Sequence, residues 1–348
     1  MTPIVLSTLI MSLGIGTTLT FTSTHWFLAW MGIEINTLAI IPLMTQDHSP
    51  RATEATTKYF FAQATASATL LFAATSNAFF TGSWDILQYN HPLSSSLLTL
   101  ALAMKIGLAP LHSWMPEVMQ GLNLLTALIL STWQKLAPMC LIYQIQPHNP
   151  MLIILLGLLS IIMGGWGGFN QVQLRKILAY SSIAHLGWMV LILPFSSSLT
   201  LLAFATYLMM TFTLFYSFML VKTTHINALS VSWTKIPTLT ALIPFILLSL
   251  GGLPPLTGFL PKWLILQELT KQELAPIAAL AALFSLFSLY FYLRLSYSMT
   301  LTMLPNNPMG TLPWRLNSTN STFPLALTTT VTIIPSPITP ALVSFFLP

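Results

Sequence analysis

The chain has 348 residues, of which 55% are hydrophobic and only 5% are charged, whereas a soluble domain carries roughly 25% charged residues, so a water-soluble globular fold is excluded. The net charge of +5 comes from 12 scattered basic residues, of which only Arg175 and Lys176 are adjacent, and this excludes a basic nucleic-acid-binding face. The single cysteine, Cys140, excludes a disulfide within the chain and a cysteine-based cluster or zinc site carried by this chain alone.

The hydropathy pattern predicts an all-α polytopic membrane protein with about eleven transmembrane helices, each of roughly 20 residues. The first basic residue is Arg51, so the apolar N-terminus lacks the positive region of a secretory signal and is predicted to be the first span. The predicted spans, in chain order, are 3–21, 25–44, 59–80, 93–121, 122–146, 150–170, 175–194, 199–222, 237–272, 274–304 and 323–347.

The fourth and ninth predicted spans contain helix breakers that belong to an internal repeat. Residues 107–117 and 252–262, which lie 145 positions apart, share glycine, leucine, proline, leucine, an aromatic residue, proline and a charge in the same order. Paired interrupted spans in the two halves of a membrane protein point to an ion or substrate pathway. We therefore expect broken helices around 107–112 and 251–258. The breakers are Gly107, Pro110, Gly252, Pro254 and Pro255.

Basic residues are distributed unequally between the two sides of the predicted membrane. Seven lie on the side of the N-terminus and Lys271 alone lies on the other, which satisfies the positive-inside rule. This distribution predicts an N-terminus on the matrix or cytoplasmic side, a C-terminus opposite, and an inverted repeat. We expect one transmembrane domain, 1–348, with a first repeat at 1–146, a second at 150–304 and a C-terminal helix at 323–347. The seven residues are Arg51, Lys58, Arg175, Lys176, Lys222, Lys235 and Arg315.

Among the charged residues inside the predicted spans, four are not explained by the topology. Glu34 lies in the second span, Lys105 just before the first break, Lys135 in the fifth span and Lys262 just after the second break. Each charge near the bilayer centre costs roughly 2.5 to 3.5 kcal/mol on insertion scales, so four cost about 10 to 14 kcal/mol unless they are paired or hydrated. We interpret them as a proton pathway.

For Glu34, Lys105 and Lys262, and for two histidines that are further candidates, the sequence leaves an alternative interpretation open. Glu34 and Lys105 form a static ion pair in one such interpretation, and Lys262 extends its amine to the membrane interface in another. His112 follows the first break and is a candidate for extending the pathway, and the sequence leaves this role open. His185, in the middle of the seventh span, is either a relay group or a hydrogen-bonded core histidine.

The sequence resembles the subunit 2 family of mitochondrial NADH:ubiquinone oxidoreductase, respiratory complex I, one of the antiporter-like membrane subunit families. The resemblance extends over essentially the whole chain, and its length is similar to the animal mitochondrial version, which lacks three N-terminal helices of bacterial relatives. The segments that carry it are WMGIEINTL at 30–38, EATTKYF at 54–60, KIGLAP at 105–110, TWQKLAP at 132–138, QLRKILAYSSIAH at 173–185 and the stretch 251–263.

The resemblance implies a role for each intramembrane charge. Glu34 is expected to pair with Lys105, while Lys135 and Lys262 continue a hydrated axis through the membrane arm of the complex. It also implies that the chain is part of an H⁺-translocating NADH:ubiquinone reductase but has no redox centre itself. NAD, FMN, iron–sulfur clusters and ubiquinone are expected in partner subunits.

The resemblance further implies a hetero-oligomer in the mitochondrial inner membrane. The expected partners are other complex I membrane subunits, accessory subunits and lipids, with no nucleic acid. With the charge distribution, this predicts the N-terminus on the matrix side and the C-terminus on the intermembrane-space side. Two alternatives remain, a stand-alone cation/proton antiporter and a structural subunit that only bridges modules. The sequence argument for the antiporter is weaker than that for the complex I subunit, because the spans contain no buried aspartate or pair of carboxylates to hold a dehydrated cation.

Overall fold

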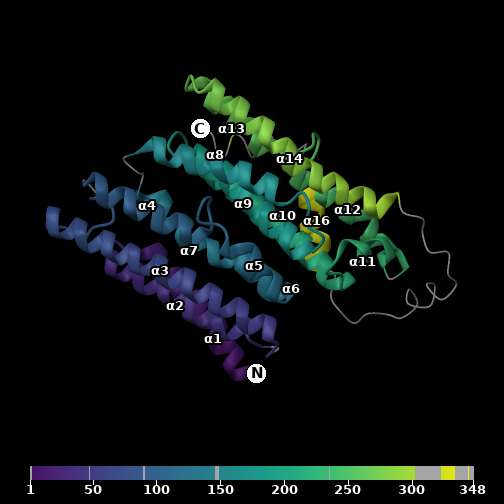
Figure 1. Cartoon of the computed structure of the whole chain (residues 1–348), viewed down its shortest axis with the longest axis horizontal. Helices are drawn as coiled ribbons and strands as arrows, with labels where there is room; N and C mark the ends of the chain where they lie inside the picture. The colour runs from purple at the N-terminus through teal and green to yellow at the C-terminus, as the bar shows by residue number, and fades with distance from the viewer. Residues whose placement is uncertain are drawn as a thin grey trace. The chain divides into compact units, whose positions relative to one another are not determined.

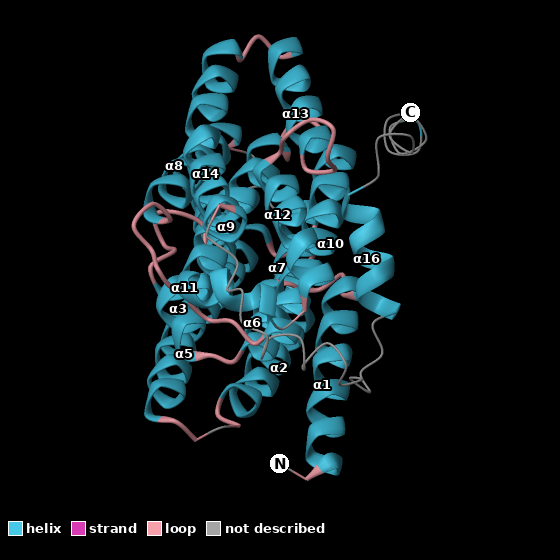
Figure 2. Ribbon diagram, turned by 90° about the vertical axis from the view of Figure 1, so that its right-hand side faces the viewer, coloured by secondary structure: helices cyan, strands magenta, loops and turns pink. Residues whose placement is uncertain are grey.

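The computed structural model describes residues 2–46, 48–88, 91–145, 149–234, 236–301, 323–333 and 344. Within these ranges every regular element is a helix, as Figure 2 shows in cyan, and only two isolated bridges of β type occur. The chain divides into two compact units, Met1–Ser160 and Ile161–Pro348. Helix α8 (Pro150–Gly167) begins in the first unit and ends in the second.

The first unit is built around helix α2, which packs against both α1 and α3 (Figure 1). Helix α3 also contacts α4 and α5, and α7 contacts α1, α2 and α4. The helices of this unit before α8 are α1 (Pro3–Thr22), α2 (Trp26–Met44), α3 (Pro50–Thr81), α4 (Pro92–Ile106), α5 (Trp114–Gly121), α6 (Leu124–Ser131) and α7 (Trp133–Ile145).

In the second unit, α10 contacts α9, α12, α13 and α16. Helix α14 packs against α9, α11, α12 and α13. The elements of the second unit after α8 are α9 (Leu174–Ile192), α10 (Ser197–Val221), α11 (Ile226–Ser230), a 3₁₀ turn (Val231–Thr234), α12 (Pro237–Gly251), α13 (Phe259–Lys271), α14 (Ala275–Thr300) and α16 (Phe323–Ile333).

Local sequence signals explain where many of these helices begin and end. Pro50 opens α3 at the first helical position, where its missing N–H costs nothing. The Ser49 side chain accepts a hydrogen bond from the Ala52 N–H and caps the same helix. Gly82 ends α3 in the left-handed conformation, with φ of 71°. Prolines start α1, α4 and α12 in the same way.

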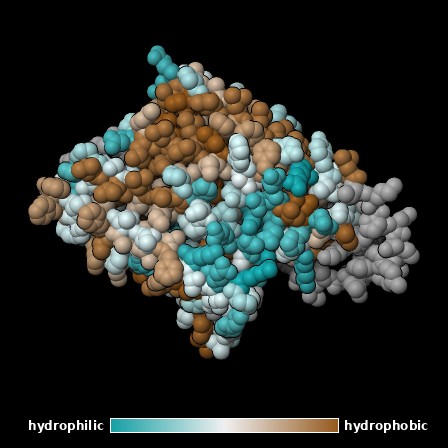
Figure 3. Space-filling model, in the orientation of Figure 1, coloured by the Kyte–Doolittle hydropathy of each residue, from teal (hydrophilic) through white to brown (hydrophobic). Residues whose placement is uncertain are grey.

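The helices have the length and composition of membrane spans. Six helical segments of the described chain are long and apolar enough to cross a bilayer, and shorter apolar helices accompany them. Their outer faces carry large apolar side chains: Figure 3 shows brown over α14, where Leu280, Leu283 and Leu286 are exposed. The predicted all-α polytopic membrane fold is therefore confirmed.

The structure refines several predicted spans. The fourth and ninth are each divided into two helices, α4 with α5 and α12 with α13. The fifth, predicted as one helix, is interrupted at Thr132 between α6 and α7. The last predicted span is helical over Phe323–Ile333; 334–343 and 345–348 lie outside the described residues, as do Lys235 and Arg315 from the charge count.

Candidate functional site

The first helix break follows directly from glycine at the end of α4. Gly107 has φ of +87°, a left-handed conformation that glycine adopts without a steric penalty. The N–H groups of Gly107 and Leu108 both donate to the Ala103 carbonyl, which closes the helix end. The chain then runs as turns to Trp114, where α5 begins.

The second break repeats this geometry at the end of α12. Gly252 has φ of +82°, and the N–H groups of Gly252 and Leu253 donate to the Leu248 carbonyl. Helix α13 begins at Phe259. Both breaks also contain a cis peptide bond, at Ala109–Pro110 and at Pro254–Pro255.

A third interruption separates α6 from α7 and was not predicted from the sequence. Thr132 leaves the helical conformation, with φ of −114° and ψ of −69°. Its hydroxyl donates to the Leu128 carbonyl at 2.8 Å, the same carbonyl that its backbone N–H uses. Such back-bonding by threonine bends helices. Because α7 starts at Trp133, Lys135 lies in the first turn of a new helix.

A small cavity lined by polar and apolar side chains lies in the first unit, where α2 to α7 meet. It leaves about 20 Å³ of space for the centres of water-sized molecules, slightly above the roughly 10 to 15 Å³ that one water needs. Lys105 and Lys135 both line it, and their exposed fractions are only 5% and 3%. The polar side chains beside them belong to Asn36, Thr37, Tyr59, Gln63 and Gln134.

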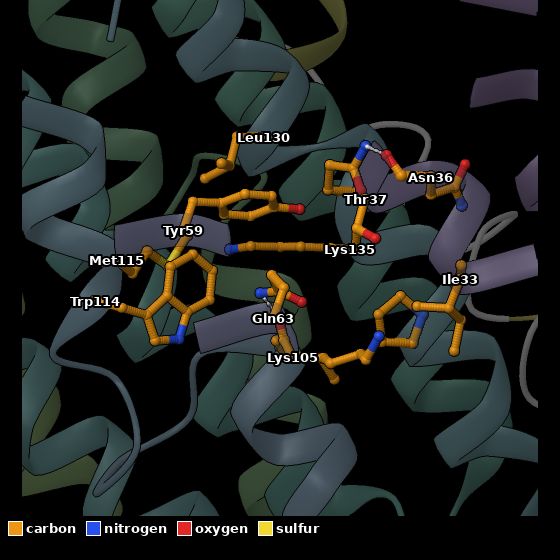
Figure 4. A pocket seen from close by; sticks show the side chains of 14 residues that line it. Ile33, Asn36, Thr37, Tyr59, Gln63, Lys105, Trp114, Met115, Leu130 and Lys135 are labelled. Carbon is orange, nitrogen blue, oxygen red and sulfur yellow. Dashed lines mark hydrogen bonds between the residues drawn. The ribbon is translucent and has the colours of Figure 1, made fainter. Parts of the chain in front are cut away.

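The two lysines occupy different parts of this cavity. Figure 4 shows the Lys135 side chain running between Tyr59 and Gln63, with Lys105 below them in the view. The Gln63 amide donates to the backbone carbonyl of Lys105 at 3.3 Å. The amine of Lys105 has no hydrogen-bond partner among the described residues. The cavity therefore contains one lysine amine whose polar contacts the surrounding protein does not supply.

Glu34 lies on α2 beside this cavity but is not among the residues that line it. Its side chain is half-buried, and its Oε2 accepts a hydrogen bond from the Thr37 hydroxyl at 3.1 Å. The charge of Glu34 acts on Lys105 electrostatically. The pairing expected from the resemblance is consequently not a direct hydrogen bond to the Lys105 amine.

Lys262 belongs to the second unit and contacts the second break itself. Its Nζ donates to the Gly251 carbonyl, the last residue of α12, at 2.9 Å. A Cβ atom at Gly252 would lie 3.0 Å from both the Cδ and the Nζ of Lys262. The Lys262 side chain is half-buried. It therefore folds back across the break, which differs from the interfacial alternative considered above.

The two candidate histidines lie in separate units. His112 is part of the first break, is half-buried, and has an Nδ1 atom that is buried without a hydrogen-bond partner among the described residues. His185 lies on α9, with its ring 5.8 Å from the ring of Tyr207. Neither histidine lines the cavity of Lys105 and Lys135. In the described part of the chain, no group of three His, Cys, Asp or Glu side chains is arranged to hold a metal ion.

Sequence reasoning missed the uncharged polar residues of the cavity. Tyr59 and Gln63 are four residues apart on α3, and this spacing places them on one helix face. Asn36 and Thr37 project from the corresponding face of α2. Polar residues at helical spacing inside an apolar span are the signal that identifies such positions.

Comparisons with known proteins agree over nearly the whole chain. Residues 23–288 match the family model described as NADH:quinone oxidoreductase/Mrp antiporter, TM, and residues 289–343 match the model described as NADH dehydrogenase subunit 2 C-terminus. The chain is 64% identical over 346 residues to NADH-ubiquinone oxidoreductase chain 2 of Tetraodon nigroviridis, with 99% of each chain covered. The protein of the same name from Gadus morhua is 61% identical, with 98% of each covered.

Solved structures show the same fold. A chain of respiratory complex I from Thermus thermophilus with bound aureothin has a TM-score of 0.83 at 27% identity, covering 96% of this chain and 78% of that one. A chain of the Mrp complex from Dietzia has a TM-score of 0.85 at 16% identity, covering 97% and 76%, and shares the fold alone. The chain belongs to the NADH-ubiquinone oxidoreductase chain 2 family.

Proposed function

We propose that the chain is a core subunit of the membrane arm of respiratory complex I and provides part of its proton-translocation pathway. The observation that carries this proposal is that two buried lysines, Lys105 and Lys135, line the same cavity. A protonated amine is costly inside a membrane protein unless a counter-charge or polar groups compensate it. Such a site therefore responds strongly to small changes in its surroundings.

The energies involved fit this role. Moving one charge across a potential of about 100 mV takes roughly 2.3 kcal/mol. A hydrogen bond to a charged group contributes roughly 1.5 to 3 kcal/mol. Making or breaking one contact at Lys135, or altering the distance between Glu34 and Lys105, is therefore sufficient to change the protonation of a lysine against the membrane potential. Lys262 at the second break, with His112 and His185, extends the proposed pathway.

The proposal includes the surroundings of the chain. It lies in the mitochondrial inner membrane as one transmembrane domain of two repeats, with its N-terminus on the matrix side and its C-terminus on the intermembrane-space side. Support for this orientation comes from Arg51, Lys176 and Lys222, which lie at ends of α3, α9 and α10 predicted for that side. The partners are other membrane subunits, accessory subunits and lipids. NAD, FMN, iron–sulfur clusters and ubiquinone are held by partner subunits.

Complex membership is tested first by gentle solubilisation of the native membrane. We expect the chain to migrate on a native gel with a very large NADH dehydrogenase that contains flavin and iron–sulfur clusters. Mass spectrometry identifies the chain, and in-gel NADH oxidation identifies the complex. Migration of the chain alone, or as a small oligomer, favours the stand-alone cation/proton antiporter, for which sodium-dependent pH changes in vesicles are the decisive assay.

The pathway is tested by Lys135→Met in the intact complex, reconstituted into liposomes. We expect coupled proton pumping and quinone reduction to fall by roughly tenfold or more, since the variant removes a protonatable group from the path. Lys271→Met is the matched control, because its side chain is 61% exposed at the end of α13. Unchanged pumping in Lys135→Met, with normal assembly, would exclude this lysine from the pathway.

A further inference from the structure

Thr37 lines the cavity and also hydrogen-bonds the Glu34 carboxylate. It lies three residues after Glu34 on α2, so the two side chains are neighbours on one helix face. Glu34 itself does not line the cavity of Lys105 and Lys135, whereas Thr37 does. The threonine side chain therefore provides a polar contact between the carboxylate and the lining of the cavity.

The contact geometry places a single hydroxyl proton between two acceptors of the same residue. The Oγ1 of Thr37 is 2.9 Å from the backbone carbonyl of Glu34 and 3.1 Å from its Oε2. Thr37 is only 6% exposed, so water competes little for this proton. A hydroxyl that donates one hydrogen bond still has lone pairs that accept from a donor on another side. Thr37 lines the same cavity as Lys105 and Lys135.

We propose that Thr37 is a positioning residue, which holds the Glu34 carboxylate in the rotamer that couples its charge to the lysine cavity. This inference rests on the proposed function, because it assigns a role within the same pathway. The charge of Glu34 acts on both Lys105 and Tyr59, which lie on different helices of that cavity. The strength of a charge interaction depends on distance, so a carboxylate that is free to change rotamer has a variable interaction energy with the lysine.

The competing explanation is that the hydroxyl only satisfies its own helix. Many threonines of this chain donate to a carbonyl three residues earlier, and Thr56 on α3 is a close match. Thr56 is also 6% exposed, its Oγ1 donates to the Thr53 carbonyl at 2.8 Å, and it does not line the cavity. The two threonines thus differ in the contact to a carboxylate and in their exposure to the lysine cavity.

The test compares Thr37→Val with Thr56→Val in the intact complex reconstituted into liposomes. Valine keeps the shape of threonine and removes the hydroxyl. We expect Thr37→Val to lower the maximal rate of coupled proton pumping roughly tenfold, the loss expected for one hydrogen bond to a charged group, with the KM for quinone unchanged. Thr56→Val is expected to leave the rate unchanged, and Thr37→Ser to restore it.

A double-variant cycle separates positioning from a merely structural effect. If Thr37 acts through the carboxylate, Thr37→Val causes no further loss in a Glu34→Gln background. Equal effects of Thr37→Val and Thr56→Val, or additive losses with Glu34→Gln, would overturn the inference. If Glu34→Gln and Lys135→Met both leave pumping intact, the proposed pathway fails. If only Thr37→Val has no effect, the pathway stands and the positioning role is wrong.

Discussion

The two helix breaks have nearly the same backbone but different side-chain chemistry. Each begins with a glycine of positive φ, and each closes its helix with paired N–H donors on one carbonyl. In the first break the lysine, Lys105, precedes the glycine and lines a cavity. In the second break Lys262 follows the glycine and returns to the carbonyl of Gly251.

Position-by-position comparison of the repeat makes this difference specific. Glu117 occupies the place of Lys262, and it forms an ion pair with Lys58 at 2.7 Å on an exposed surface. Leu250 occupies the place of Lys105 and is fully buried. The repeated sequence therefore encodes a backbone interruption twice. The lysine beside the interruption occupies a different position in each copy.

The largest expected effect comes from Gly258, whose counterpart in the first copy is Ser113. A Cβ atom at Gly258 would overlap the backbone oxygen of Ser249, whereas Ser113 is exposed. We expect Gly258→Ser to destabilise the second break by about 3 kcal/mol or more and to reduce assembly of the complex. The amount of complex on a native gel measures this, with Ser113→Gly as the control. Normal assembly of Gly258→Ser would mean that the close approach is not required.

The next largest effect is expected from substitution of Lys262, which should reduce proton pumping more than assembly of the complex. Lys262→Met removes the hydrogen bond to the Gly251 carbonyl and the protonatable amine beside the break. We expect coupled proton pumping to fall by roughly tenfold. Proton pumping and quinone reduction in liposomes measure the effect. Lys271→Met on the same helix is exposed and is expected to retain the full rate. Equal rates for the two variants would place Lys262 outside the pathway.

A smaller effect is expected from alanine at the two left-handed glycines. Gly107→Ala and Gly252→Ala each place a side chain at positive φ, which costs about 1 to 2 kcal/mol. In Gly252→Ala the new Cβ also meets the Lys262 amine, while in Gly107→Ala it meets Met115 at 3.3 Å. We expect similar losses of thermal stability but a loss of pumping only in Gly252→Ala.

Gly82→Ala serves as the control for strain alone in this comparison. Its φ is +71°, and a Cβ there meets no atom within 4 Å. Its thermal unfolding, followed in the intact complex, should resemble that of Gly107→Ala. Loss of pumping in Gly107→Ala equal to that in Gly252→Ala would show that the backbone conformation, and not the contact with Lys262, controls activity.

The smallest effect is expected at the ion pairs of Lys58. This residue lies on α3 just before the predicted span 59–80. The hydrogen bonds that the Lys58 amine donates to Glu117 and Glu54 raise the pKa of Lys58, and Lys58 lowers the pKa of Glu54. A raised lysine pKa stabilises the folded protein below about pH 10.5, and a lowered carboxyl pKa stabilises it above about pH 4.3. Lys58→Met is therefore expected to reduce thermal stability slightly between these values, and the reduction should shrink progressively as the pH falls below about 4.3 through the lowered carboxyl pKa. The side chains are exposed, so salt weakens the effect.

Much of the fold was predictable because its signals are local. Scarcity of charge identifies a membrane protein, and proline or glycine inside an apolar segment identifies a break, without knowledge of any contact. Gly107 and Gly252 were found in this way, and both end a helix with positive φ. The interruption at Thr132 was missed because threonines also bond back to carbonyls inside unbroken helices, as Thr211 does on α10, so the residue type does not mark a break.

The candidate charges were predictable for a similar reason, since an ionised side chain inside a span is costly wherever it packs. What those charges touch depends on residues distant in the chain. Gln63 reaches the carbonyl of Lys105 across 42 positions, and Lys262 reaches back 11 positions to Gly251. The sequence by itself determined the membrane class, the breaks and the identity of the buried charges. Only the tertiary structure decided that Lys105 and Lys135 share a cavity and that Thr37 stands between it and Glu34, because helix packing alone sets the distances between side chains on different helices.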